Sequence, residues 1–242
     1  YECGRILDVE IWRGDTDEGP DGKVYINDVH VDTYYDKYST RNGETGYYWV
    51  YVKNTAGRGK PTLVSGTPFG HPDEPAVLMA TSGDGRVHLE WEPPPFWGGR
   101  TENLSYGLFR GDTEDSIDTL VKVLTADDDS YIDNESLALG EIYWYGLQAR
   151  NIGYRSGLTK NSTLVYEPPG VPVVTNVTRG DKNITIRWDP PSSDGGSSIT
   201  GYHFSSKIEN GAWSKPILLD AQTHEYTWSN LLNGESHWFR LS

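Results

Sequence analysis

The strongest constraint on the fold is a repeat with a period of about 97 residues. Arg13-Gly14-Asp15-Thr16 reappears 97 positions later as Arg110-Gly111-Asp112-Thr113, and Trp91-Glu92-Pro93-Pro94 reappears at the same offset as Trp188-Asp189-Pro190-Pro191. Further matches at or near this offset are Asp32-Thr33-Tyr34 with Asp129-Ser130-Tyr131, and Gly43-Glu44 with Gly140-Glu141 and Gly234-Glu235. Self-similarity at a fixed period indicates a row of equivalent structural units. The sequence therefore predicts an array of small domains.

Within each unit, hydrophobic residues alternate with polar ones, as they do in half-buried β-strands. Val87, Leu89 and Trp91 follow this pattern, and so do Tyr143, Tyr145, Leu147 and Ala149. Proline and glycine clusters separate such segments. About seven short strands with turn signals at this spacing predict antiparallel β-sandwiches.

The aromatic positions resemble those of fibronectin type III domains. They are Trp91 followed by Pro93-Pro94, then Tyr106, and later Tyr143 and Tyr145, followed by Leu147, Ala149, Asn151 and Gly153. The resemblance covers nearly the whole chain. It implies an all-β fold of tandem immunoglobulin-like antiparallel β-sandwiches, with Trp91 and Trp188 as core residues of strand B. It also implies that Tyr143 forms a tyrosine corner. The corresponding positions of the first and third units hold Gly46 and His237, so the corner hydrogen bond is in question there.

The repeat divides the chain into three units. We expect a partial first unit with strands C to G over 1–70, a complete second unit over 71–168, and a partial third unit with strands A to F over 169–242. Incomplete sandwiches leave unpaired strands and open apolar faces. We therefore expect the polypeptide to extend both ways, in preference to self-assembly or strand complementation by partner chains. The linkers at 66–72 and 167–172 are short and contain proline, which predicts semi-rigid joints.

Charge and composition narrow the range of partners. A net charge of -14 with only 21 Lys and Arg argues against nucleic acid and anionic membranes. No stretch of the sequence has the length and apolarity of a membrane span, so membrane insertion of this segment is not expected. A single cysteine, Cys3, excludes an internal disulfide framework.

Five N-x-S/T sequons favour an extracellular or cell-surface location and are glycosylation candidates: Asn103, Asn134, Asn161, Asn176 and Asn183.

Three RGD tripeptides raise cell adhesion as a function. The copies that begin at Arg13 and Arg110 fall at the end of strand C, and the copy that begins at Arg179 falls in the A-to-B turn. In adhesive modules of the resembled family the tripeptide instead lies on the F-to-G loop. Gly-Asp is also common turn chemistry. We therefore interpret the copies as structural, and keep Arg110, Gly111 and Asp112 as a candidate adhesion motif.

Large side chains in two loops predict a contact surface. The candidate binding residues are Phe96, Trp97 and Arg100 in one loop and Tyr154 and Arg155 in another. The resembled topology places both loops at the pole next to the first unit. We expect them to contact that unit in preference to an external ligand, and we expect the arginines to face its acidic loop.

That acidic loop contains the candidate calcium ligands Asp15, Asp17 and Asp21, whose spacing is similar to that of an oxygen-ligand loop. The loop lacks the glycine and the terminal glutamate of an EF-hand, so we expect it to be solvated, with no metal or other cofactor bound. The histidines are dispersed, and no nucleophile motif accompanies them, so we do not expect an enzyme.

These observations favour a non-catalytic extracellular spacer and protein-interaction segment of a larger cell-surface or secreted protein. Its expected partners are other protein domains or cell-surface proteins. One alternative is an adhesin or receptor ectodomain that binds a protein or glycan through loop aromatics or RGD. Another is the accessory region of a secreted hydrolase, because a fold does not by itself define a function.

Overall fold

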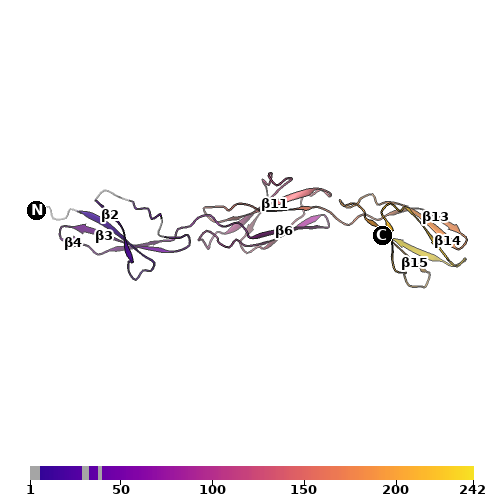
Figure 1. Cartoon of the computed structure of the whole chain (residues 1–242), viewed down its shortest axis with the longest axis horizontal. Helices are drawn as coiled ribbons and strands as arrows, with labels where there is room; N and C mark the ends of the chain where they lie inside the picture. The colour runs from indigo at the N-terminus through magenta and orange to yellow at the C-terminus, as the bar shows by residue number, and fades with distance from the viewer. Residues whose placement is uncertain (1–5, 29–32, 38–39) are drawn as a thin grey trace.

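The computed structural model is an elongated molecule in which the three units follow one another end to end (Figure 1). It describes residues 6–28, 33–37 and 40–242, so Cys3 and Asp32 lie outside the described residues. All regular structure in the described residues is β-strand, and the paired strands are antiparallel. The predicted all-β fold is therefore confirmed. No helix capable of crossing a bilayer occurs in the part of the chain that is described.

The first unit contributes one five-stranded sheet in the order β2-β1-β3-β4, with β5 also paired to β3. Its strands are β1 (Asp8–Gly14), β2 (Gly22–Asp28), β3 (Gly46–Asn54), β4 (Gly57–Arg58) and β5 (Thr62–Gly66). The described residues of this unit form no second sheet to oppose the first.

The second unit is a sandwich of two sheets, ordered β10-β7-β6 and β12-β11-β8-β9. Its strands are β6 (Val77–Gly83), β7 (Arg86–Glu92), β8 (Ser105–Gly111), β9 (Thr119–Thr125), β10 (Ser130–Asp133), β11 (Ile142–Arg150) and β12 (Thr159–Leu164). Both edges of β11 are paired, one with β8 and the other with β12.

The third unit has two three-stranded sheets, ordered β13-β14-β17 and β16-β15-β18. Its strands are β13 (Val173–Gly180), β14 (Asn183–Asp189), β15 (Gly201–Ile208), β16 (Ile217–Asp220), β17 (Glu225–Ser229) and β18 (His237–Leu241). Within the described residues β18 pairs with β15 along one edge only.

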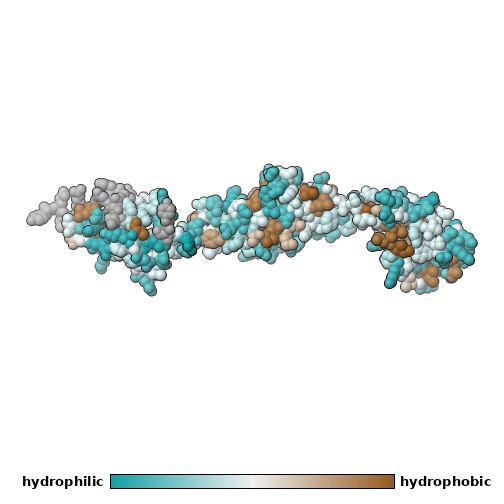
Figure 2. All heavy atoms as spheres, viewed as in Figure 1, coloured by the Kyte–Doolittle hydropathy of each residue, from teal (hydrophilic) through white to brown (hydrophobic). Residues whose placement is uncertain are grey.

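The two sandwich cores are built on the predicted tryptophans. Trp91 is buried, and its indole N–H donates to the carbonyl oxygen of Asp128 (2.9 Å). Its ring meets Tyr106 edge to face, and Trp188 meets Tyr202 in the same way in the third unit. Such aromatic pairs add to the stabilisation that burial alone gives. On the face seen in Figure 2, hydrophobic residues reach the surface in separate patches between larger hydrophilic areas.

The tyrosine corner is confirmed in the second unit, where the Ala138 N–H donates to the hydroxyl of Tyr143 (3.1 Å). In the third unit His237 occupies the corresponding position, and its buried Nε2 atom has no hydrogen-bond partner among the described residues. The corner bond that ties the strand to the preceding loop is thus not reproduced by the histidine.

Candidate functional site

The first feature that bears on function is the arginine of the second RGD copy, which points into the protein. The Arg110 guanidinium donates to the Asp133 carboxylate (2.7 Å) and to the carbonyl oxygen of Glu135 (2.9 Å). The Tyr145 hydroxyl donates to the same carboxylate (2.9 Å). Asp133 has no exposed surface, and the Arg110 side chain is only 17% exposed. A buried carboxylate requires such partners, because an unpaired buried charge is costly.

The first unit repeats this arrangement 97 positions earlier. The Tyr48 hydroxyl donates to the Asp36 carboxylate (2.7 Å), and Arg13 Nε lies 3.8 Å from the same carboxylate. Arg13 also pairs with Asp15 (2.8 Å). Both arginines therefore form an ion pair with a carboxylate that also accepts a tyrosine hydroxyl, although Arg13 Nε, unlike the Arg110 guanidinium, makes no hydrogen bond among the described residues.

The glycine of the motif is also required by packing. A Cβ atom on Gly111 would stand 2.9 Å from the Cα atom of Ile117 and still closer to the Ser116 backbone. The adjacent Asp112 is exposed. The third copy forms the β13–β14 hairpin, where Asp181 accepts a hydrogen bond from Asn233 Nδ2 (2.8 Å). The candidate motif of Arg110, Gly111 and Asp112 thus presents an aspartate but not its arginine.

Burial displaces the pKa values of the groups in this core. Desolvation, followed by the charge of Asp133, raises the pKa of the Tyr145 hydroxyl well above its ordinary value. Desolvation raises the pKa of Tyr106 to about 12. Desolvation is the largest single influence and opposes the charge on Arg110, but the hydrogen bond and the charge of Asp133 together with Tyr145 outweigh it and raise the arginine pKa. These shifts arise from the burial of the three side chains in the sandwich and from their contacts there.

The candidate binding residues of the second unit surround the linker that precedes it. Tyr154 contacts the ring of Phe69 edge to face (5.7 Å between centroids) and lies 4.6 Å from that of His71. The Arg100 guanidinium lies 3.9 Å from the centre of the Phe69 ring. His71 Nδ1 donates to the carbonyl oxygen of Arg155 (2.9 Å). These residues form an aromatic collar, by which we mean Phe69, His71, Arg100 and Tyr154.

Phe96 and Trp97 have different environments although they are neighbours. Trp97 packs against the core, with its ring 5.3 Å from that of Tyr106. Phe96 is 40% exposed and faces Gly43 of the first unit. Asn151 donates to the carbonyl oxygens of Trp97 (3.1 Å) and Gly70 (2.9 Å), which ties this loop to the linker.

Among the described residues, Arg100 and Arg155 form no ion pair with the acidic loop of the first unit. Among the described residues, the ion pair of Asp15 is with Arg13. The carboxylate of Asp21 accepts the backbone N–H of Asp15 (3.0 Å), which closes the loop on itself. No group of three or more His, Cys, Asp or Glu side chains in the described part of the chain is placed to hold a metal ion, and this covers Asp15, Asp17 and Asp21.

The joint between the first and second units is fixed by backbone hydrogen bonds. The Gly43 N–H donates to the carbonyl oxygen of Pro68 (2.9 Å). The Gly70 N–H donates to the carbonyl oxygen of Gly98 (2.9 Å). The linker is therefore bonded to a loop of the unit before it and to a loop of the unit after it.

The joint between the second and third units contains the same two bonds, 97 positions later. The Gly140 N–H donates to the carbonyl oxygen of Val165 (2.9 Å). The Glu167 N–H donates to the carbonyl oxygen of Gly195 (2.8 Å). Among the described residues the second joint has no aromatic collar, since Tyr166, Pro168 and Ser197 stand 97 positions after Phe69, His71 and Arg100.

The sequons differ in how free their amides are. Asn161 donates its Nδ2 group to the carbonyl oxygen of Leu78 (2.8 Å), and Asn183 donates to that of Asp181 (3.0 Å). Asn103, Asn134 and Asn176 are exposed, and Asn176 Nδ2 donates to the hydroxyl oxygen of Thr178 (3.4 Å).

The residues that sequence reasoning missed are the partners of long-range contacts. Asp133 was not expected to be buried, because its place in the short strand β10 has no distinctive local pattern. In the sequence, Asn151 stands out only as one position of the pattern that resembles fibronectin type III domains. Its distance of 81 residues from Gly70 gives no signal in a single sequence.

Comparison with known proteins finds relatives of low sequence identity. No protein-family model matches the chain. Titin of Drosophila melanogaster is 28% identical over 209 residues, which are 80% of this chain and 1% of titin. Receptor-type tyrosine-protein phosphatase F of Mus musculus is 27% identical over 181 residues, which are 72% of this chain and 9% of the phosphatase. The FN1–FN3 domains of chicken contactin (CNTN1) match with a TM-score of 0.39 and 15% identity, over 98% of this chain and 82% of that chain. The chain thus spans a small fraction of the curated relatives it matches.

Proposed function

We propose that this tandem of fibronectin type III sandwiches is a non-catalytic spacer and protein-interaction segment of a larger cell-surface or secreted protein. The observation that carries the proposal is the repeated joint, in which linker and loop backbones form the same two hydrogen bonds at Gly43 and Gly70 and again at Gly140 and Glu167. Short linkers bonded at both ends restrict the angle between neighbouring units. The segment then sets the distance and orientation of whatever flanks it. We also propose that 1–70, 71–168 and 169–242 are the three building units.

The charged groups of the second unit support a structural role. Arg110, Asp133 and Tyr145 hold one another within the core. None of them is free to act as an acid, a base or a nucleophile toward an external substrate. Adhesion through Arg110 is therefore not part of the proposal.

A location outside the cell is also part of the proposal. The sequons at Asn103, Asn134 and Asn176 are exposed, which supports it. The relatives differ in this respect, since one is named a receptor-type phosphatase and titin is intracellular. Mass spectrometry of the chain from a secreting eukaryotic host tests this part, and unmodified asparagines at all exposed sequons would argue against it.

Small-angle X-ray scattering tests the spacer role directly. We expect the scattering of the 242-residue chain to fit one elongated particle with fixed angles at both joints. Scattering that requires a broad distribution of angles at both joints would contradict the proposal. Cell attachment to the immobilised chain is a second test, and we expect Asp112→Glu to leave it unchanged.

A further inference from the structure

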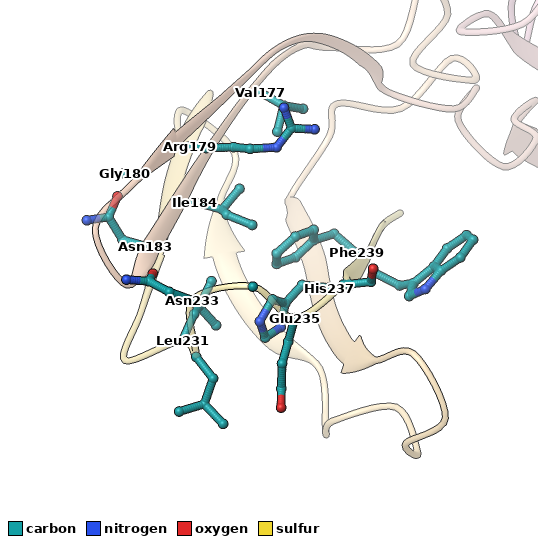
Figure 3. Close-up of a pocket in the computed structure, with 14 residues that line it drawn as sticks. Val177, Arg179, Gly180, Asn183, Ile184, Leu231, Asn233, Glu235, His237 and Phe239 are labelled. Carbon is teal, nitrogen blue, oxygen red and sulfur yellow. The ribbon is translucent and has the colours of Figure 1, made fainter.

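The second unit is a closed sandwich, so a surface that stays open on it is a property of the folded unit itself. The groove that the third unit shows between Ile184 and Phe239 (Figure 3) is filled in the second unit by that unit's own Val165, which is fully buried. Strands β8 and β11 are each paired along both edges. The outer face of their sheet is therefore the surface that a partner can meet.

An arginine side chain lies across this outer face. The guanidinium carbon of Arg150 is 5.3 Å from the centre of the Phe109 ring, and a Cβ atom on Gly107 would overlap the guanidinium. Its Nε donates to Oε1 of Gln148 (3.2 Å), and the amide of Gln148 donates to the carbonyl oxygen of Ser156 (3.0 Å). The arginine is thus held at Nε, and its two terminal nitrogens make no hydrogen bond among the described residues.

No carboxylate of the described residues balances this charge. Neither Arg150 nor Arg155, its partner in an isolated β-bridge, forms an ion pair in that part of the chain. Desolvation, followed by the charge of Arg155, lowers the pKa of Arg150. Two like charges are therefore held close together on a chain whose net charge is -14.

The first unit shows how the same positions are neutralised. Lys53 and Arg58 stand 97 positions before the two arginines. Lys53 Nζ lies 3.9 Å from the carboxylate of Asp8, and Arg58 lies 3.5 Å from that of Glu10. Glu10 is buried and also accepts the Lys23 ammonium (3.1 Å). Two carboxylates on β1 thus balance the cations of this face.

The second unit keeps both cations and lacks both carboxylates. Ser105 and Gly107 stand 97 positions after Asp8 and Glu10. The missing side chain at Gly107 leaves the space that the Arg150 guanidinium occupies. A carboxylate supplied from outside would restore the balance that Glu10 gives the first unit. Carboxylates match the forked donors of arginine, and such bonds gain strength where water is excluded.

Apolar side chains border the guanidinium. Phe109 is the cross-strand partner of Leu120, and Gly107 is that of Val123. Cross-strand partners lie on the same face of a sheet. Leu120 and Val123 are 50% and 54% exposed, so this border is open to a partner. Arginine and aromatic residues are enriched in protein interfaces, and contiguous exposed apolar side chains mark interaction sites.

We propose that the outer face of β8, β9 and β11 binds an acidic segment of a partner protein. A glutamate or aspartate carboxylate of that segment accepts hydrogen bonds from the terminal nitrogens of Arg150 and pairs with Arg155. An apolar side chain next to the carboxylate packs on Phe109, Leu120 and Val123. A sulfated glycan fits less well, because polyanions bind to larger clusters of cations than this pair.

This inference rests on the protein-interaction part of the proposed function and does not depend on stiffness at the joints. Scattering tests the spacer role, whereas peptide binding tests this face. The failure of one is therefore distinguishable from the failure of the other.

NMR of the arginine side chains in the intact chain tests the proposal. The probe is the peptide acetyl-Leu-Glu-Leu-amide, and its matched control is acetyl-Leu-Gln-Leu-amide. We expect the glutamate peptide to shift the Nε resonance of Arg150 saturably. We expect the glutamine peptide to bind about tenfold more weakly or less, because it lacks the charge. Equal affinity of the two peptides, or an unchanged Arg150 resonance, would overturn the proposal.

Ser105→Asp is the matched variant of the chain, since it installs the carboxylate that Asp8 provides in the first unit. We expect it to weaken binding of the glutamate peptide by about tenfold or more, because Arg150 is then neutralised from within. Thr178→Asp adds the same charge on the third unit and should leave binding unchanged. Binding to Ser105→Asp at the strength of the unmodified chain would also overturn the proposal.

Two further measurements identify other occupants. A sulfated heparin disaccharide that binds more tightly than the glutamate peptide would assign the face to sulfated glycans and overturn the choice of a protein partner. Sedimentation velocity that shows self-association of the chain, lost in Arg150→Gln, would assign the face to a second copy and overturn that choice as well. We expect weaker disaccharide binding and no such self-association.

Discussion

Gly99 packs backbone against backbone on Gly43, so that a Cβ atom on Gly99 would stand 2.7 Å from the Cα atom of Gly43. Gly196 stands in the same relation to Gly140, with its φ at 82° where Gly99 has 85°. A side chain at either position would meet backbone that cannot move aside, and it would also occupy a left-handed conformation. Glycine at these positions is therefore a requirement of the joint.

We expect Gly196→Ala to loosen the second joint. The left-handed backbone alone costs about 1–2 kcal/mol with a side chain present, and the contact with Gly140 adds to this. Small-angle scattering should show a wider range of angles between the second and third units. Gly22→Ala is the matched control, because nothing lies within 4 Å of a Cβ atom there. Identical scattering of the two variants would contradict the requirement for glycine.

We expect Phe69→Ala to weaken the first joint by removing the centre of the aromatic collar. Loss of the contacts with Tyr154 and Arg100 should cost about 1–2 kcal/mol of coupling between the units. Thermal unfolding followed by calorimetry should then resolve transitions that overlap in the unmodified chain. Tyr166→Ala, 97 positions later, is the matched control and should have a smaller effect, since Tyr166 is 43% exposed.

We expect Arg110→Ala to destabilise the second unit by about 3–5 kcal/mol, because it leaves the Asp133 carboxylate buried without its cation. Urea denaturation followed by tryptophan fluorescence measures this change. Asp112→Ala removes the exposed aspartate of the same tripeptide and should stay within about 0.5 kcal/mol of the unmodified chain. A small effect of Arg110→Ala would show that the arginine is not needed in the core.

We expect the second unit to lose stability above about pH 10, the ordinary pKa of tyrosine. Burial raises the pKa of Tyr106 to about 12 in the folded chain, so the folded state holds the tyrosine proton more tightly than the unfolded state does. The stabilisation of the folded state that results is complete below the unfolded pKa of about 10 and is lost as the pH rises toward the folded pKa. Between these values each pH unit lowers the free energy of unfolding by about 1.4 kcal/mol for this residue. Tyr106→Phe should reduce the slope of stability against pH by that amount. Urea denaturation at pH 8, 10.5 and 11.5 provides the comparison.

The sequence predicted the features that repeat or alternate. The 97-residue offset and the alternation around Trp91 and Tyr145 led to the correct fold class, because these patterns follow from the two-residue period of a strand and the period of a tandem array. The tyrosine corner at Tyr143 followed from the resemblance to fibronectin type III domains.

The contacts that could not be predicted join residues distant in sequence. Arg110 was correctly placed at the end of a strand, but only the folded sandwich brings it to Asp133, 23 residues later. The sequence predicts that Arg100 and Arg155 face the acidic loop of the first unit. The Arg100 guanidinium instead lies over Phe69 in the linker, and backbone groups of Gly43 and Gly70 form the hydrogen bonds of the joint. Backbone contacts of this kind leave no pattern of residue types beyond the glycines.

The repetition of one set of hydrogen bonds at both joints has a geometric consequence. If the same rotation and the same translation relate each unit to the one before it, equivalent faces recur at regular intervals and at a constant rotation along the row of units. Ligands attached to such faces would be displayed as a regular ladder, with valency set by the number of units.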